Sequence, residues 1–166
     1  MPLFSAAPGI LTEVYRMFRF LPGKQHQLAV VAGASRFGTQ AAGLFSEKGY
    51  DVIIIDTDSD AFSKLPDNFE GLTIEGDASD TSVLETARIK KAAVCVAATD
   101  SDSTNSLIAQ ITARIYMVPG VYCRLSDAAN ADMLTRSRIH IICPSDLCLQ
   151  EFERQNRLAD IGGTLQ

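Results

Sequence analysis

The stretch Leu28-Ala-Val-Val-Ala-Gly33-Ala-Ser-Arg-Phe-Gly38 decides the fold, together with Asp51-Val-Ile-Ile-Ile-Asp56, which follows it. An apolar strand ending at Gly33 is predicted to turn sharply into a helix, whose free N–H groups and positive dipole end can hold a phosphate. Gly38 would let that helix lie close to the sheet, and Asp56 would accept hydrogen bonds from a ribose diol. The pattern is typical of a dinucleotide-binding unit.

Ser35 departs from the usual G-x-G-x-x-G pattern. The middle glycine of that pattern marks the place where the backbone approaches a pyrophosphate most closely. Because Ser35 puts a side chain there, we expect it to crowd the pyrophosphate of a dinucleotide more than a single phosphate group. The next residue, Arg36, lies at the predicted helix start, where a guanidinium can meet a phosphate.

Composition excludes several classes of function. The chain has 166 residues, of which 46% are hydrophobic, enough for one domain with a sizeable core. A formal charge of -5 argues against a nucleic-acid binder, which needs a basic face. No stretch approaches the roughly 20 apolar residues of a membrane span, and Arg16 and Arg19 interrupt the N-terminal apolar run, so export is not expected. The four cysteines lack metal-ligand spacing, and we expect buried, reduced thiols of a cytosolic protein.

Short apolar runs alternate with helical patterns along the chain, which indicates β-α units and a mainly parallel sheet. Strands are predicted at 28–32, 51–56, 72–75, 93–98, 121–124 and 139–142. Helices are predicted at 37–48, 59–65, 80–87, 103–116 and 128–136, with a last one from 145. Because right-handed crossovers dominate, we expect a Rossmann-like, doubly wound α/β sheet with the order 3-2-1-4-5-6. Its ligand crevice would open above strands 1 and 4.

The loops at the carboxyl ends of strands 1 to 4 can reach this crevice. They contain the predicted ligand-binding residues Gly33, Ala34, Ser35, Arg36, Phe37, Gly38, Asp56, Thr57, Asp58, Gly76, Asp77, Ala78, Ala98, Thr99 and Asp100. Capping competes with ligand binding at helix starts, because a side-chain oxygen there can accept from a free helix N–H. We interpret Asp58, Ser59, Ser79, Asp80 and Asp102 first as caps, and Asp56 as a ligand-binding residue.

Four segments, in their order and spacing, resemble the N-terminal lobe of RCK proteins, also called the KTN or TrkA-N domain. They are Gly33-Ala-Ser-Arg-Phe-Gly38, Asp56, Gly76-Asp77-Ala78-Ser79 and Ala98-Thr99-Asp100-Ser101-Asp102-Ser103-Thr104-Asn105. The resemblance extends from about Leu28 to Ile142. It implies a regulatory subunit of a Trk or Ktr potassium transporter or a related channel. Such a subunit would bind an adenine nucleotide, either NAD(H) or AMP, ADP or ATP, and report its state to a membrane partner.

The resemblance also implies a noncatalytic, cytoplasmic protein that forms a homodimer or higher homo-oligomer. It would reach the inner face of the membrane through the transporter. It would not insert into the membrane directly and would not bind nucleic acid. NADP is disfavoured, because Asp56 would repel a 2′-phosphate. We expect a free-standing N-lobe without the RCK C-terminal lobe. Its parts would be an extension at 1–27 with a short amphipathic helix, a nucleotide-binding domain at 28–143, and a C-terminal helix and tail at 144–166.

Two alternative functions stay open. A small NAD-dependent oxidoreductase would use the same fold, but hydride transfer needs a proton donor or acceptor, commonly a Tyr/Lys pair or a histidine. No tyrosine has a lysine four positions on, and we interpret His26 and His140 as structural. The second alternative is an interaction module that has lost nucleotide binding, which takes its support from Ser35.

Overall fold

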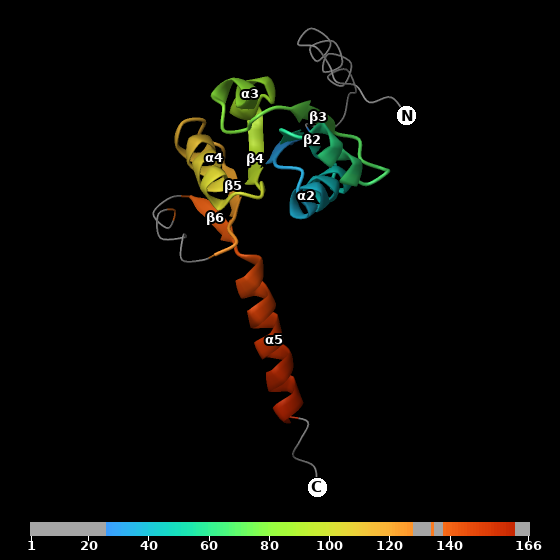
Figure 1. Ribbon diagram of the computed structural model, residues 1–166, viewed down its shortest axis with the longest axis vertical. Coiled ribbons are helices and arrows are strands. Elements are labelled where there is room, and N and C mark those ends of the chain that lie inside the picture. The colour runs from blue at the N-terminus through green and yellow to red at the C-terminus, as the bar shows by residue number, and fades with distance from the viewer. Residues whose placement is uncertain (1–25, 128–133, 135–137, 162–166) are drawn as a thin grey trace.

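A parallel sheet forms the centre of the protein in the computed structural model, which describes residues 26–127, 134 and 138–161 (Figure 1). Within these residues the strands are β1 (Leu28–Ala32), β2 (Asp51–Asp56), β3 (Leu72–Glu75), β4 (Ala92–Ala97), β5 (Gly120–Arg124) and β6 (Ile139–Ile142). Their order is β3-β2-β1-β4-β5-β6, and every neighbouring pair is parallel. The predicted Rossmann-like α/β topology is confirmed.

The central strands are buried on both faces, which explains why their sequences are unbroken apolar runs. All five residues of β1 are buried, as are the four central residues of β2. Val31 pairs with Ile54 on one side and with Val96 on the other. A run of this kind, bounded by turn residues, is therefore a strong predictor of a strand, and the predicted strand bounds are correct to within one residue.

Six helical segments accompany the sheet in the described part of the chain. They are α2 (Arg36–Glu47), the 3₁₀ helix η1 (Ser59–Lys64), α3 (Thr81–Thr86), the 3₁₀ turn η2 (Ile89–Lys91), α4 (Asp102–Arg114) and α5 (Pro144–Ile161). The predicted α-helix at 59–65 is wrong in type. Leu65 is extended, because Pro66 disfavours a helical residue before it, so only a short 3₁₀ segment forms. The helix predicted at 128–136 lies outside the described residues, apart from position 134.

Two apolar clusters hold helices against opposite faces of the sheet. On one face α2 and η1 pack on the sheet, with Ala42 beside Ile54 in the cluster. On the other face α3 and α4 contribute Leu84 and Ile108, which pack with Ile53. Because Ile53 and Ile54 are neighbours in β2 and point to opposite faces, both layers are anchored on the same strand.

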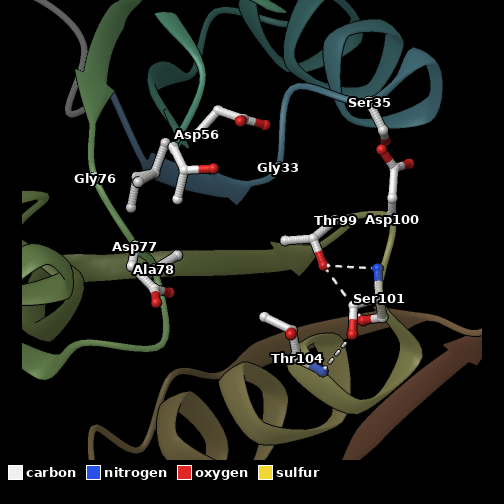
Figure 2. Close-up of a pocket in the computed structure, with 12 residues that line it drawn as sticks. Gly33, Ser35, Asp56, Gly76, Asp77, Ala78, Thr99, Asp100, Ser101 and Thr104 are labelled. Carbon is white, nitrogen blue, oxygen red and sulfur yellow. Dashed lines mark hydrogen bonds between the residues drawn. The ribbon is translucent and has the colours of Figure 1, made fainter.

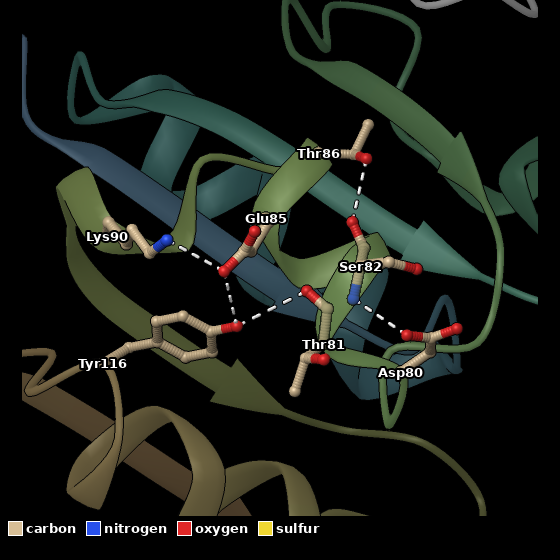
Figure 3. A network of polar contacts seen from close by, with 7 residues as sticks. All are labelled: Asp80, Thr81, Ser82, Glu85, Thr86, Lys90 and Tyr116. Atoms are coloured by element: carbon tan, nitrogen blue, oxygen red, sulfur yellow. Dashed lines mark hydrogen bonds and ion pairs between the residues drawn. The ribbon is translucent and has the colours of Figure 1, made fainter.

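A surface network joins α3 to the segment that follows α4 (Figure 3). The Tyr116 hydroxyl donates to Glu85 at 3.3 Å, and Lys90 pairs with the same carboxylate at 2.8 Å. The hydrogen bond and charge of Lys90 lower the pKa of Glu85. All these groups are accessible to solvent, so the network positions α3 without adding much stability.

Helix α5 extends away from the sheet (Figure 1). Leu147, Leu149 and Phe152 on this helix are 55%, 58% and 61% exposed. The expectation of buried thiols holds for Cys95, Cys123 and Cys143 but is wrong for Cys148, which lies exposed on α5. Among the described residues, no helix combines the length and the apolar character that crossing a membrane requires.

Candidate functional site

A pocket of about 430 Å³ opens at the carboxyl ends of β1 to β4 (Figure 2). It is lined by Gly33, Ser35, Ile55, Asp56, Thr57, Gly76, Asp77, Ala78, Thr99, Asp100, Ser101 and Thr104. The four predicted loops therefore meet at one place. That place is the crevice between β1 and β4, where the strand order reverses and where open α/β sheets bind their ligands.

Most of the predicted site residues line this pocket, and six do not. Those outside the lining are Ala34, Arg36, Phe37, Gly38, Asp58 and Ala98. Arg36 is the first residue of α2 and is exposed to solvent, whereas Phe37 packs against the apolar cluster beneath that helix. Arg36 therefore stands at the helix start, as predicted, but its side chain is not part of the pocket wall.

Three residues of the lining were missed by the sequence prediction: Ile55, Ser101 and Thr104. Ile55 precedes Asp56 in β2, and Thr104 lies in the first turn of α4. The prediction considered only loops after strand ends. A wider rule, which adds the last two strand residues and the first turn of the following helix, would have found Ile55 and Thr104. Ser101 lies in the β4–α4 loop itself, directly before α4, and was left out of the list although its loop was predicted.

Gly33 and Gly38 are required by the packing of the turn itself. Gly33 has a φ of +107°, and a Cβ there would lie 2.5 Å from the backbone nitrogen of Thr99. A Cβ on Gly38 would collide with the carbonyl oxygen of Gly33. The turn after β1 thus lies directly against the start of the β4–α4 loop, and the helix start lies against the turn.

Asp56 holds this turn from the neighbouring strand. Its Oδ2 accepts a hydrogen bond from the backbone N–H of Ala34 at 2.6 Å, and its Oδ1 accepts one from Asp58 at 2.9 Å. The sequence predicted Asp56 as a ligand-binding residue, and this structural role was not predicted. The two roles are compatible, because each carboxylate oxygen has a second lone pair and Asp56 lines the pocket.

Ser35 is the N-cap of α2. Its Oγ accepts from the backbone N–H of Gly38 at 3.2 Å and donates to the carbonyl of Ala98 at 2.6 Å. The hydroxyl thus joins the start of α2 to the end of β4. A serine directly before a helical pattern is typical of an N-cap. In the sequence, Ser35 was compared with the middle glycine of the nucleotide-binding pattern, and this role was not predicted.

Asn105, in α4, holds the β4–α4 loop in place through hydrogen bonds. Its side chain is fully buried. Its Oδ1 accepts from the backbone N–H and the hydroxyl of Thr99, both at 2.7 Å, while its Nδ2 donates to the carbonyls of Thr99 and Arg124, both at 3.0 Å. Since all its hydrogen-bonding capacity is used within the protein, Asn105 positions Thr99 and does not itself face a ligand.

The capping predictions are confirmed for two residues and wrong for three. Asp58 caps η1 and Asp80 caps α3, which excludes Ser59 and Ser79 because one residue occupies each N-cap. Ser101 caps α4 in place of Asp102, whose carboxylate accepts instead from the backbone of Ser126 at 2.9 Å.

Ser79 has a different role from the predicted cap. Its hydroxyl and its backbone N–H both donate to Asp77, at 2.7 and 2.8 Å. These bonds lower the pKa of Asp77. Asp77 therefore faces the pocket as a carboxylate at neutral pH.

The fold and this pocket define a Rossmann-like α/β domain with a site at its switch point. The TrkA-N domain family matches residues 29–144, and the chain belongs to that family. It is 41% identical, over 78 residues, to a Trk system potassium uptake protein TrkA homolog of Pyrococcus horikoshii, with 47% of this chain and 34% of the relative aligned. The chain therefore spans about one third of that relative's length.

Solved structures of low sequence identity share the fold. The Kef C-terminal domain of Shewanella denitrificans, solved in an AMP-bound form, aligns with a TM-score of 0.59 and 23% identity, over 80% of this chain and 81% of that one. The GsuK channel bound to NAD aligns with a TM-score of 0.59 and 14% identity, over 81% of this chain and 25% of that one. At these identities the likeness is one of architecture.

Proposed function

We propose that this chain is a cytoplasmic, nucleotide-binding regulatory domain of a potassium uptake system. Membership of the TrkA-N family and the likeness to a Trk system protein support the connection with potassium. The observation that carries the nucleotide assignment is the pocket itself. It joins the glycine turn after β1 to the acid that ends β2, at the switch point of the sheet.

The ligand we propose is an adenine nucleotide, either AMP, ADP, ATP or NAD(H). A phosphate would lie at the amino end of α2, against the turn at Gly33 and Ser35, because free helix N–H groups and the helix dipole favour an anion there. The ribose diol would donate to Asp56. NADP is the nucleotide we exclude, because its 2′-phosphate would face this carboxylate.

The role we propose is regulatory and noncatalytic. Carboxylates, hydroxyls and small or aliphatic residues line the pocket within the described ranges, and His26 and His140 lie outside that lining. A ligand shifts a conformational equilibrium only through its difference in affinity for the two states. Regulation would therefore depend on two nucleotides, or on full and empty pockets, that favour different arrangements of the domain and its membrane partner.

We further propose that the domain acts as a homodimer or higher homo-oligomer attached to a membrane potassium transporter. The exposed apolar side chains of Leu147, Leu149 and Phe152 on the projecting helix α5 support self-association. Full burial of each of these side chains in an interface would contribute on the order of 1.5–3 kcal/mol to the free energy of association.

Mass spectrometry of any nucleotide that copurifies with the full chain tests this function. We expect an adenine nucleotide, and calorimetry with AMP, ADP, ATP and NAD should give saturable binding at one site per chain. Small-angle scattering should differ between nucleotide states. Absence of binding to all four nucleotides would leave the interaction module as the better reading, whereas substrate-dependent NADH oxidation across a panel of carbonyl compounds would favour the oxidoreductase.

A further inference from the structure

The pocket wall is acidic. Asp56, Asp77 and Asp100 all line it, and among the described residues that form the wall there is neither a lysine nor an arginine. A nucleotide phosphate is an anion, so a site built for one usually offers cations as well as backbone N–H groups. Here the helix start and the glycine turn would face a phosphate without a basic side chain in the wall.

Two of these carboxylates are held by hydrogen bonds within the protein, and the third is not. Asp56 accepts from the backbone of Ala34 and Asp58, and Asp77 accepts from Ser79. Asp100 is exposed, and its side chain forms no hydrogen bond or ion pair within residues 26–127, 134 and 138–161. Its charge is therefore available to act on a bound ligand.

Asp100 lies beside the place where a phosphate would be held. The turn at Gly33 is in contact with the backbone of Thr99, and the Ser35 hydroxyl donates to the carbonyl of Ala98. Asp100 follows these two residues directly in the chain. Figure 2 shows its side chain directed toward the Ser35 end of the pocket.

We propose that Asp100 makes the pocket select against phosphate charge, so that it favours AMP and dinucleotides such as NAD over ATP. This inference rests on the proposed nucleotide function. Each added terminal phosphate brings more negative charge near the Asp100 carboxylate, and like charges a few ångströms apart repel one another measurably even near a protein surface. In a dinucleotide each phosphate of the pyrophosphate carries a single charge, so the repulsion stays smaller.

Calorimetry with AMP, ADP and ATP on the full chain and on Asp100→Asn, in EDTA to remove divalent cations, tests the inference. The parent should bind AMP most tightly and ATP least. Asp100→Asn should gain about tenfold in affinity for ATP and about two- to threefold for AMP, because the lost repulsion scales with ligand charge. Asp67→Asn is the matched control, since it removes the same charge from an exposed position outside the pocket wall. The control should leave the ratio of ATP to AMP affinity unchanged.

The possible outcomes separate the two proposals. Failure of the parent to bind any nucleotide would overturn the proposed function and this inference together. Normal binding with an unchanged affinity ratio in Asp100→Asn would overturn the inference alone. If added Mg²⁺ tightens ATP binding in the parent and not in the variant, Asp100 recruits a cation for the triphosphate, which is the opposite of the selectivity proposed.

Discussion

The carboxylate of Asp56 accepts a hydrogen bond from the backbone N–H of Ala34 at 2.6 Å, although 22 residues separate the two in sequence. The acid at the end of β2 therefore fixes the conformation of the turn at the end of β1. A ligand that donates to Asp56 from the pocket would bind to a group that is already positioned. Binding of such a ligand and the shape of the turn would be coupled through this one side chain.

We expect Asp56→Ala to lower both the free energy of unfolding and nucleotide affinity. Loss of a charged acceptor for two backbone N–H groups should cost about 1.5–3 kcal/mol of stability, and loss of the ribose contact should weaken binding about ten- to hundredfold. Urea unfolding without nucleotide measures the first effect, and calorimetry on the folded variant measures the second. A folded variant that binds all four nucleotides like the parent would contradict the ribose assignment and leave only the structural role.

Ser35→Gly should raise the affinity for NAD(H) relative to AMP, because it removes the side chain from the predicted approach of the pyrophosphate. It should also destabilise the protein by about 1 kcal/mol, through loss of the bonds to Gly38 and Ala98. Ser35→Ala is the matched variant, since it removes the hydroxyl and keeps Cβ. Similar NAD-to-AMP affinity ratios in all three proteins, measured by calorimetry, would mean that the serine side chain does not crowd a dinucleotide.

Asn105→Ala should destabilise the protein by about 3 kcal/mol. It would remove the hydrogen bonds that Asn105 makes to the partly buried N–H of Thr99 and carbonyl of Arg124, and would leave a cavity at a fully buried position. An unsatisfied buried polar group costs about 1–3 kcal/mol. Asn156→Ala, at an exposed position on α5, serves as the control and should change stability by less than about 0.5 kcal/mol. Urea unfolding compares them. Equal stability of the two variants would show that the β4–α4 loop is held without Asn105.

The buried thiols predict a loss of stability at alkaline pH. Burial raises the pKa of Cys95 to about 12 and that of Cys123 to about 11, from an ordinary value of 9.0. Below pH 9 both states keep these protons. Above it the unfolded chain loses them while the folded protein retains them, so unfolding becomes more favourable, by at most about 1.4 kcal/mol per pH unit for each thiol.

Unfolding curves between pH 8 and 11 measure this effect. Cys95→Ala should show a shallower decline than the parent, and Cys148→Ser, at an exposed position, should follow the parent. Iodoacetamide at pH 8 should modify Cys148 and leave Cys95 and Cys123 unmodified by mass spectrometry. Rapid alkylation of Cys95 in the folded protein would contradict its burial.

The strands and their order could be predicted because the signals are local and repeated. Runs such as Val52–Ile55 have no competing interpretation once turn residues bound them, and the right-handed crossover rule then leaves one natural order. The four loops that line the pocket followed from that topology, because the carboxyl ends of parallel strands meet at one edge of a sheet.

The contacts within the site could not be predicted in the same way. Which of several adjacent polar residues caps a helix depends on where the backbone leaves the extended conformation, so Ser101 rather than Asp102 takes that position in α4. The hydrogen bond from Ala34 to Asp56 joins the turn after β1 to the end of β2, and the spacing of these residues along the chain does not predict it. Arg36 stands at the expected helix start, but it is exposed and outside the pocket wall, which the sequence pattern alone does not reveal.

Substitution of Phe152 by lysine should dissociate the proposed homodimer. Phe152 is 61% exposed on a helix that extends from the sheet, and an ammonium group in an apolar interface is costly to desolvate. A homodimer contains Phe152 twice, so loss of these buried aromatic side chains, at about 2–3 kcal/mol each, should raise the dimer dissociation constant on the order of a thousandfold or more. Gln150→Lys is the control, because it adds the same charge at an exposed polar position of the same helix.

Sedimentation velocity over a range of concentrations should give a dimer for the parent and for Gln150→Lys, and a monomer for Phe152→Lys with its AMP binding retained. A parent that sediments as a monomer at every concentration would contradict the dimer, and a dimeric Phe152→Lys would place the interface away from this face of α5.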